Sequence, residues 1–175
     1  MAKIIFGGCG SIAAYKMCDL ARLLVKDGHD VHPVLTVNAA SLVAPLALSE
    51  VCGRKVRLEM FGQRADMEHI ELRHDAALLL IAPATANILA KCAAGIADDL
   101  LSTTYLSVSC PVLCAPAMNP AMWAHAAVRR NVERLMRDGV HFCGPVAGDV
   151  LCGDNGVGKM SDIEEIVKHV RTALG

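Results

Sequence analysis

The sequence has few aromatic residues and almost no net charge, and both shortages argue against one class of partner. Phe, Trp and Tyr make up 3% of the 175 residues, and 17 basic against 18 acidic side chains leave a formal net charge of −1. A nucleic-acid-binding surface needs basic groups for the phosphates and aromatic rings on which bases stack. The composition therefore gives no support to nucleic-acid binding.

The N-terminus lacks the features of a secretion signal and of a membrane span. Its first ten residues, MAKIIFGGCG, form a short apolar run that glycines interrupt,. Hydrophobic residues make up 54% of the sequence and charged residues 20%, which is typical of a globular chain with a sizeable core,. We therefore expect one domain over residues 1–175, in a cytoplasmic protein.

No CxxC pair occurs among the eight cysteines, which argues against a structural zinc site. Such sites normally use two close cysteine pairs. The closest pair here, Cys110 and Cys114, brackets PVL in an apolar run, and no second tight pair follows. We expect reduced thiols, most of them buried as small hydrophobic side chains, and no bound metal.

Strand-like and helix-like apolar patterns alternate along the sequence. Short apolar runs predict strands at 3–8, 29–36, 76–82, 110–115 and 140–144. Helical spacing predicts helices at 11–28, 39–50, 84–107 with a break near Gly95, 120–138 and 162–175, and 145–160 is predicted to be loop. The alternation predicts an α/β fold, a three-layer open parallel sheet of the Rossmann-like or flavodoxin-like kind. Ligands of such sheets bind at the carboxyl ends of the strands.

The segment after the first strand, GCGSIA (8–13), has the spacing G-x-G-x-x-A at the start of a predicted helix. Backbone N–H groups at a helix start bind phosphate, and Ser11 adds a hydroxyl. A dinucleotide site would need an acidic residue at the end of the second strand, where Thr36 and Asn38 stand instead. This favours a mononucleotide such as FMN over NAD. A tight strand–helix turn without a ligand is the alternative.

Two further segments at strand ends are PATAN (83–87) and PAMNPAMW (116–123). Thr85 is also explained as a helix cap, and Asn119 followed by Pro120 as an N-cap with a first-turn proline. His69, in MEHIEL, lies just before the third predicted strand. A histidine on a helix surface or in the core is the alternative to a catalytic role.

The segment GDNGVGKM (153–160) fits G-x-x-x-x-G-K and then departs from the P-loop pattern. Met160 stands where a P-loop has Ser or Thr, and too little chain follows for a Walker B strand,. This excludes an NTPase. A glycine-rich segment with Cys152 and Lys159 remains, which we expect to be a mobile clamp at about 145–160. A flexible surface loop is the alternative.

Together these segments resemble the homo-oligomeric flavin-containing cysteine decarboxylases. The resemblance covers nearly the whole chain and is carried by GSIAAYK (10–16), HIEL (69–72), PATAN, PAMNPAMW and CGDNGVGKM. PAMNPAMW matches the family pattern P-x-M-N-x-x-M-W. The last segment is similar to the clamp A-C-G-x-x-G-x-G-R-M of the branch that decarboxylates 4'-phosphopantothenoyl-cysteine. Leu151 replaces its small residue, Lys159 replaces its arginine, and Cys9 stands where a threonine is usual beside the flavin.

The resemblance implies an FMN-dependent lyase of coenzyme A biosynthesis that converts 4'-phosphopantothenoyl-cysteine to 4'-phosphopantetheine. The thiol would be oxidised to a thioaldehyde, CO2 would leave, and the product would be reduced again. His69 would serve acid–base steps and Cys152 would donate a proton. Asn119, Met122 and Lys159 would bind substrate. The implied cofactor-binding residues are Gly10, Ser11, Ile12, Thr36, Asn38, Thr85, Ala86, Asn87 and Ala115.

The resemblance also implies a homo-oligomer, a trimer or a dodecamer of trimers, with the flavin at a subunit boundary. The sequence ends at Gly175, so a phosphopantothenoylcysteine synthetase is expected as a separate partner or on a longer chain. Two alternatives stay open. One is a decarboxylase of a C-terminal peptide cysteine, as in lantibiotic synthesis. The other is a non-enzymatic flavin-binding regulatory subunit, which would lack His69 or Cys152.

Overall fold

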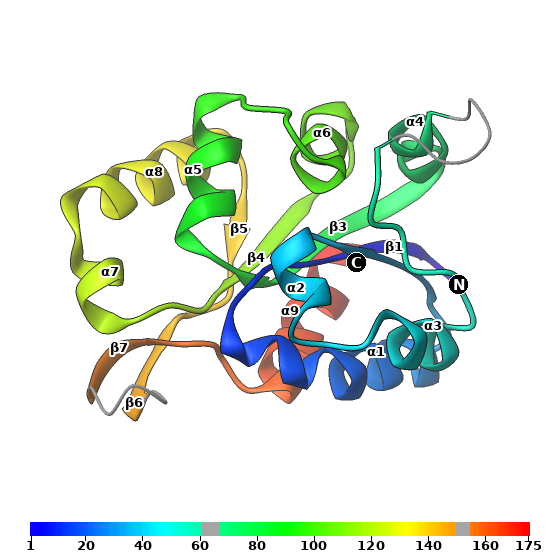
Figure 1. The fold of residues 1–175 in the computed structure, drawn as a ribbon, viewed down its shortest axis with the longest axis horizontal. Coiled ribbons are helices and arrows are strands. Elements are labelled where there is room, and N and C mark those ends of the chain that lie inside the picture. Colours follow the sequence, from blue (N-terminus) through cyan, green and yellow to red (C-terminus); the bar gives the residue numbers. More distant parts are fainter. Residues whose placement is uncertain (61–66, 150–154) are drawn as a thin grey trace.

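A five-stranded parallel sheet lies between two layers of helices in the computed structural model, which describes residues 1–60, 67–149 and 155–175 (Figure 1). The strands are β1 (Lys3–Gly8), β2 (Asp30–Leu35), β3 (Ala76–Ala84), β4 (Val112–Pro116) and β5 (His141–Phe142). Their order is β2-β1-β3-β4-β5, and all four pairings are parallel. This order confirms the predicted α/β fold of the flavodoxin-like kind, with a topological switch point between β1 and β3.

The helices divide between the two faces of the sheet. One layer holds α1 (Met17–Lys26), α3 (Pro45–Cys52) and α9 (Ile163–Leu174), and the other holds α4 (Glu68–Arg73), α5 (Ala86–Ala94), α6 (Leu100–Ser107) and α8 (Ala126–Arg137). Alternate residues of β1 enter opposite cores, since Ile4 and Phe6 pack in one cluster and Ile5 in the other. This period of two explains why the central strands are apolar throughout.

Several predicted helices are divided at capping residues. The break expected near Gly95 is confirmed, because Gly95 ends α5 with a left-handed φ of 71° and Asp99 caps α6,. The predicted helix over 39–50 is instead α2 (Val37–Ala40) and α3, since Pro45 starts a new helix,. The predicted helix over 120–138 is α7 (Pro120–Ala124) and α8, divided at His125. The α4 helix has no counterpart among the predicted helices.

The loop predicted over 145–160 is wrong for the described part of that segment. β6 (Val146–Asp149) and β7 (Asn155–Lys159) pair antiparallel as a second, two-stranded sheet. The glycines of this segment disguise the strands, because glycine is depleted in most strands. The expected mobility of the clamp stays a prediction, and residues 150–154 lie outside the described residues.

The start of the first predicted helix is a 3₁₀ turn, η1 (Ile12–Lys16), which leads into α1. The seven cysteines within the described ranges are free thiols. Within those ranges no group of three or more His, Cys, Asp or Glu side chains could hold a metal ion. None of the described helices has both the length and the apolar character needed to cross a membrane.

Candidate active site

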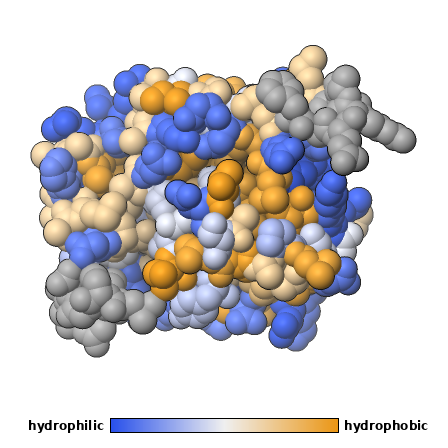
Figure 2. Space-filling model, in the orientation of Figure 1, coloured by the Kyte–Doolittle hydropathy of each residue, from blue (hydrophilic) through white to orange (hydrophobic). Residues whose placement is uncertain are grey.

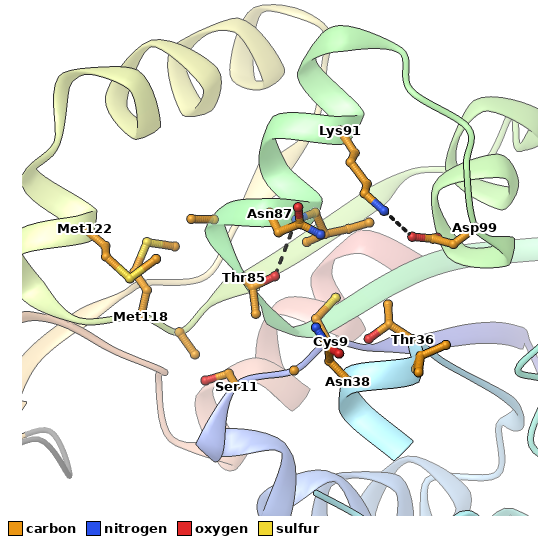
Figure 3. A pocket seen from close by; sticks show the side chains of 15 residues that line it. Cys9, Ser11, Thr36, Asn38, Thr85, Asn87, Lys91, Asp99, Met118 and Met122 are labelled. Atoms are coloured by element: carbon orange, nitrogen blue, oxygen red, sulfur yellow. Dashed lines mark hydrogen bonds and ion pairs between the residues drawn. The ribbon is translucent and has the colours of Figure 1, made fainter. Parts of the chain in front are cut away.

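A pocket of about 500 Å³ opens at the carboxyl edge of the sheet, where β1, β2, β3 and β4 end (Figure 3). It lies at the switch point between β1 and β3, the place where open α/β sheets bind ligands. Seven of the nine residues predicted to bind the cofactor line it. They are Gly10, Ser11, Thr36, Asn38, Thr85, Ala86 and Asn87. The fold thus brings together side chains that are far apart in the sequence.

Hydroxyl groups form much of this edge because each strand ends at a helix cap. The Oγ of Ser11 accepts from the N–H of Ala13 at 3.4 Å, at the start of η1. Thr36 and Thr85 accept from the third residue of α2 and of α5, at 3.3 and 3.4 Å. The cap predicted at Thr85 is therefore present, Ser11 and Thr36 are caps as well, and all three residues line the pocket.

Gly10 allows two loops of the pocket to approach each other closely. A Cβ atom at this position would lie 2.4 Å from the Cβ of Asn38, which is too close for any side chain. The turn after β1 therefore contacts α2 directly, and the exposed Gly10 and Asn38 form one wall of the pocket. This is the close backbone approach that glycine provides at phosphate-binding turns.

Cys9 lies on the floor of the pocket and its side chain is buried. Burial raises the pKa of the Cys9 thiol to about 12, although hydrogen bonds with Thr85 oppose the shift. The thiol is therefore neutral at physiological pH, so it is a weak nucleophile. Cys9 therefore contributes a small, neutral side chain to the lining of the pocket.

An ion-paired lysine at the pocket was missed by the sequence-based prediction. Lys91 Nζ lies 2.6 Å from Asp98 Oδ1 and 2.6 Å from Asp99 Oδ2, and Lys91 and Asp99 line the pocket (Figure 3). Burial lowers the pKa of Lys91, but the two carboxylates outweigh it and the net shift is upward. The only sequence signal was the acidic pair before α6, since Asp99 also forms the capping box with Ser102,.

His69 lies outside the pocket of its own chain. It belongs to α4, and α6 stands between α4 and the α5 helix that borders the pocket (Figure 1). Its Nδ1 atom is buried and has no hydrogen-bond partner among the residues that the structure describes. A single copy therefore does not bring the predicted acid–base residue to the predicted cofactor site.

The residues predicted to bind substrate gather at the other side of the pocket. Met122 lines it, and Asn119 caps α7, where its Oδ1 accepts from the N–H of Ala121 at 2.7 Å. The β7 strand packs against this segment, because the Met118 N–H donates to the Gly158 carbonyl at 3.0 Å. Lys159 is an exposed residue of β7. Cys152 lies outside the described residues.

Two predicted cofactor-binding residues do not line the pocket. Ala115 is fully buried in β4 as part of the hydrophobic core. Ile12 lies in η1 and is 54% exposed. A pocket contact is thus missing for these two, and their role stays a prediction from the resemblance.

The sequence profile of the Flavoprotein family matches residues 1–175. The chain belongs to the Flavoprotein family. The coenzyme A biosynthesis bifunctional protein CoaBC of Vibrio cholerae serotype O1 is 44% identical over 169 residues, which are 95% of this chain and 42% of that protein. CoaBC of Mycolicibacterium smegmatis is 40% identical over 172 residues, which are 98% and 42% of the two chains. The chain thus spans less than half the length of these relatives.

Two solved structures match nearly the whole chain. A mutant PPC decarboxylase complexed with pantothenoylaminoethenethiol has a TM-score of 0.87 and 29% identity, and the match covers 98% of this chain and 97% of that one. The FMN-dependent cysteine decarboxylase SpaF has a TM-score of 0.84 and 31% identity, with 100% and 98% covered. These matches support the fold and the family that the motifs predicted.

Proposed function

We propose that the chain decarboxylates 4'-phosphopantothenoyl-cysteine to 4'-phosphopantetheine in coenzyme A biosynthesis, with FMN as its cofactor. The observation that carries the proposal is the match to a PPC decarboxylase over 98% of the chain at a TM-score of 0.87. The 44% identity to a coenzyme A biosynthesis protein supports the same reaction. The FMN-dependent decarboxylase SpaF supports the cofactor.

The pocket fits FMN in size and in chemistry. Its volume of about 500 Å³ is within the range of cofactor sites,. Gly10, Ser11, Thr36 and Asn38 would hold the phosphate, because they offer a close backbone approach, hydroxyls and an amide in place of a carboxylate,. Thr85, Ala86 and Asn87 would border the flavin ring at the start of α5.

Bound FMN would supply a two-electron acceptor for oxidation of the substrate thiol to a thioaldehyde, an electron sink that lets the neighbouring carboxylate leave as CO2. Asn119 would hold the carboxylate and amide region of the substrate, beside Met122. His69 would take and give protons in the early steps. Cys152 would donate a proton to carbon as the product is reduced. Lys159 would hold the substrate phosphate or neighbouring backbone and help to exclude water.

The position of His69 supports a homo-oligomer in which it acts on the pocket of a neighbouring copy. Exposed apolar side chains flank both regions: Met67 (61% exposed) and Ile70 (42%) beside His69, and Val37 (77%) at the pocket. Figure 2 shows hydrophobic surface exposed on this face between hydrophilic patches. Such exposure is typical of association sites. A trimer or a dodecamer of trimers is the proposed assembly.

Mixing of two inactive variants tests this shared site. His69→Gln copies and Asn119→Ala copies are denatured together, refolded with FMN and assayed against each variant treated alone. A shared site gives mixed oligomers with one intact site, so activity returns on mixing. Absence of any recovery, with mixed oligomers verified by mass, would contradict the shared site.

The two remaining parts of this proposal concern the cellular setting. A phosphopantothenoylcysteine synthetase is the proposed partner, because the CoaBC relatives are bifunctional and the chain covers 42% of their length. We also propose a cytoplasmic location, where coenzyme A precursors are processed.

Product mass decides the reaction. Protein loaded with FMN is incubated with 4'-phosphopantothenoyl-cysteine or with a peptide that ends in cysteine. The proposal expects loss of one CO2 from the pantothenoyl compound, and a flavin absorbance spectrum from the protein. Turnover of the peptide alone would instead support a peptide-cysteine decarboxylase, and protein that stays colourless after reconstitution would refute the flavin assignment.

A further inference from the structure

The α4 helix, which carries His69, is too short to hold its own position. It has six residues, and its N-cap residue Met67 makes no side-chain capping hydrogen bond. Isolated helices of this length are unstable in water because nucleation is unfavourable. Contacts with the rest of the fold must therefore fix the place and orientation of His69.

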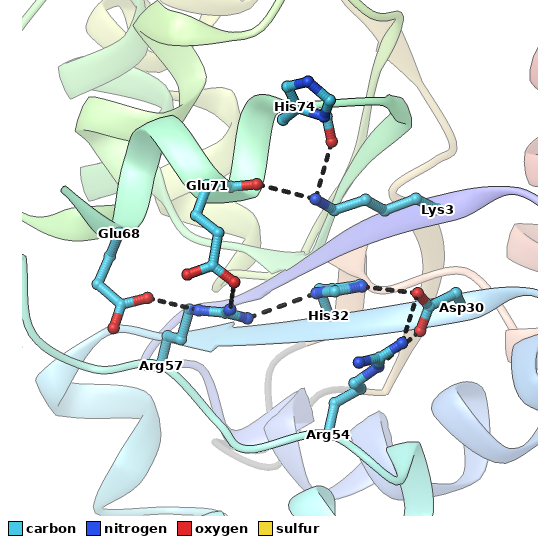
Figure 4. A network of polar contacts seen from close by, with 8 residues as sticks. All are labelled: Lys3, Asp30, His32, Arg54, Arg57, Glu68, Glu71 and His74. Carbon is cyan, nitrogen blue, oxygen red and sulfur yellow. Dashed lines mark hydrogen bonds and ion pairs between the residues drawn. The ribbon is translucent and has the colours of Figure 1, made fainter. Parts of the chain in front are cut away.

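The guanidinium group of Arg57 makes two hydrogen bonds to side chains of α4 (Figure 4). Its Nε donates to Glu68 Oε2 at 2.6 Å, and its Nη2 donates to Glu71 Oε1 at 2.7 Å. The two glutamates are three residues apart, so they lie on one side of the helix. Glu68 is the residue before His69, and its side chain is 23% exposed, against 61% for Glu71. The bond from Arg57 Nε to the less exposed Glu68 therefore contacts the helix at the residue next to His69.

Arg57 is itself held rigidly against the edge of the main sheet. Its N–H donates to the Pro33 carbonyl and its carbonyl accepts from the Leu35 N–H, both at 3.0 Å. Its side chain is 16% exposed. Both backbone groups of Arg57 are bonded to β2, so its main chain is fixed to the sheet. Its guanidinium group therefore fixes α4 relative to the sheet.

A buried histidine, His32, contacts the nitrogen of the Arg57 guanidinium group that does not bond to α4. His32 Nδ1 lies 3.4 Å from Arg57 Nη1, and His32 Nε2 lies 2.9 Å from Asp30 Oδ2. Burial lowers the pKa of His32, although Asp30 opposes the shift, so the imidazole is neutral at physiological pH. A neutral ring whose Nε2–H donates to Asp30 leaves Nδ1 to accept from Arg57. Arg54 completes the chain with two bonds to Asp30, at 2.8 and 2.9 Å.

The other end of α4 is fixed by Lys3 of β1. Its Nζ donates to the carbonyl oxygens of Glu71 and His74 at 2.9 and 2.8 Å. A cation at the C-terminus of a helix satisfies the last carbonyls and interacts well with the helix dipole. Arg57 and Lys3 thus hold α4 at two points, and the Arg57 arm on Glu68 is the contact closest in sequence to His69.

We propose that Arg57 is a positioning residue for His69 in the decarboxylation, and that it acts by clamping Glu68 and Glu71 of α4. This inference rests on the proposed function for its kinetic part. The clamping itself is a property of the folded chain and can be measured without substrate.

Arg57→Gln and Arg54→Gln form the matched pair for the test. Both remove a paired guanidinium group from the same network, but Arg54 contacts Asp30 and Arg57 contacts α4. The FMN-loaded variants are assayed for kcat and KM, and amide hydrogen exchange of α4 is followed by mass spectrometry. We expect Arg57→Gln to lower kcat by roughly 10- to 100-fold, because a small misplacement of a catalytic group is costly. KM should stay within about twofold, and α4 should exchange roughly tenfold faster. Arg54→Gln should stay near the wild type.

A double variant tests whether Arg57 acts through His69. In a His69→Gln background, Arg57→Gln should lower kcat by less than about twofold, since the group it positions is already absent. A full multiplicative loss in that background would overturn the inference, as would a wild-type kcat for Arg57→Gln. Arg57→Lys should restore part of the loss, because a lysine can keep one arm of the contact.

Glu68→Gln supplies a second route if Arg57→Gln does not fold. It changes only the Glu68 partner of Arg57, and we expect the same fall in kcat as for Arg57→Gln, with faster amide exchange of α4. If amide exchange of α4 is unchanged in both Arg57→Gln and Glu68→Gln, the inference that Arg57 holds α4 is overturned, whatever the activity. If the FMN-loaded wild-type protein turns over no substrate, the proposed function is refuted. Faster exchange of α4 in the variants than in the wild type would still support the contact between Arg57 and α4.

Discussion

Met118 donates its backbone N–H to the carbonyl of Gly158 at 3.0 Å, which joins β7 to the segment that leads into Asn119. A Cβ atom on Gly158 would lie 2.4 Å from the Met118 carbonyl oxygen and 3.1 Å from the Pro120 nitrogen. The two backbones are therefore in direct contact. The β7 strand, which belongs to the segment predicted to close over the substrate, therefore contacts the segment predicted to hold the substrate.

Gly158→Ala should separate these two segments. The added methyl group meets backbone atoms, which cannot move aside as a flexible side chain can, so we expect a loss of about 1–3 kcal/mol in stability and a lower kcat. Gly148→Ala is the matched control, because the atoms nearest to its Cβ would belong to the flexible Lys159 side chain, the first at 3.0 Å. Thermal unfolding and turnover of the FMN-loaded proteins measure both effects. Equal behaviour of the two variants would contradict the role given to Gly158.

Gly10→Ala should weaken flavin binding. Its new Cβ would lie 2.4 Å from the Cβ of Asn38, so the turn after β1 and α2 must move apart at the pocket wall. We expect the affinity for FMN to fall at least roughly tenfold, about 1.4 kcal/mol. Flavin fluorescence titration of the apoprotein measures the change. Gly148→Ala, which lies outside the pocket, should bind as the wild type does, and unchanged affinity of Gly10→Ala would argue against a phosphate site at this turn.

Much of the fold follows from sequence periodicity, and the errors have local causes. The five parallel strands were predictable because buried strands are continuous apolar runs, such as 76–82 within β3,. Divided helices were harder to predict, because Pro45 and His125 change the element without interrupting its hydrophobicity. The β6–β7 pair could not be predicted from propensity, since its glycines are depleted in most strands and the close approach of Gly156 and Gly158 to residues 118–120 is a tertiary contact.

The cofactor side of the site was more predictable than the catalytic side. Pocket residues such as Ser11, Thr36 and Thr85 follow strand ends directly, so topology alone places them together,. His69 precedes β3 on α4, and nothing in the sequence indicates that this helix lies apart from the pocket. The Arg57 clamp was equally hidden, because ion pairs between distant segments leave no periodic pattern.

The Asp99 carboxylate should make stability depend on acid pH. Burial raises the pKa of Asp99, but hydrogen bonds from Lys91 and Ser102 outweigh it and the net pKa lies below the ordinary value of 3.8. A lowered pKa means that the folded state favours the charged form, so its contribution is complete above pH 3.8 and is lost as the pH falls through the folded-state pKa. Asp99→Asn keeps a capping side chain and removes the charge.

We expect Asp99→Asn to lower the free energy of unfolding by about 1 kcal/mol at pH 7 and by much less at pH values below the ordinary pKa. Urea unfolding at pH 7 and at a pH below 3.8 measures the difference. Asp98→Asn is the control, since Asp98 contacts the same Lys91 at 2.6 Å but is 57% exposed and does not cap α6. Its effect should be smaller at pH 7. A cost of Asp99→Asn that does not change with pH would contradict the charge-based explanation.

Cys152→Ser should separate the two halves of the proposed reaction. The oxidative half needs no proton from this residue, so CO2 should still be released from 4'-phosphopantothenoyl-cysteine. The reductive half needs a proton donor at carbon, and a serine hydroxyl is far less acidic than a thiol. We therefore expect formation of complete 4'-phosphopantetheine to fall at least roughly 100-fold, with accumulation of an enethiol that has two hydrogens fewer. Mass spectrometry of the products measures both. Cys18→Ser, at a half-buried thiol of α1 outside the pocket, should give the complete product, and the same result for Cys152→Ser at the wild-type rate would show that another group donates the proton.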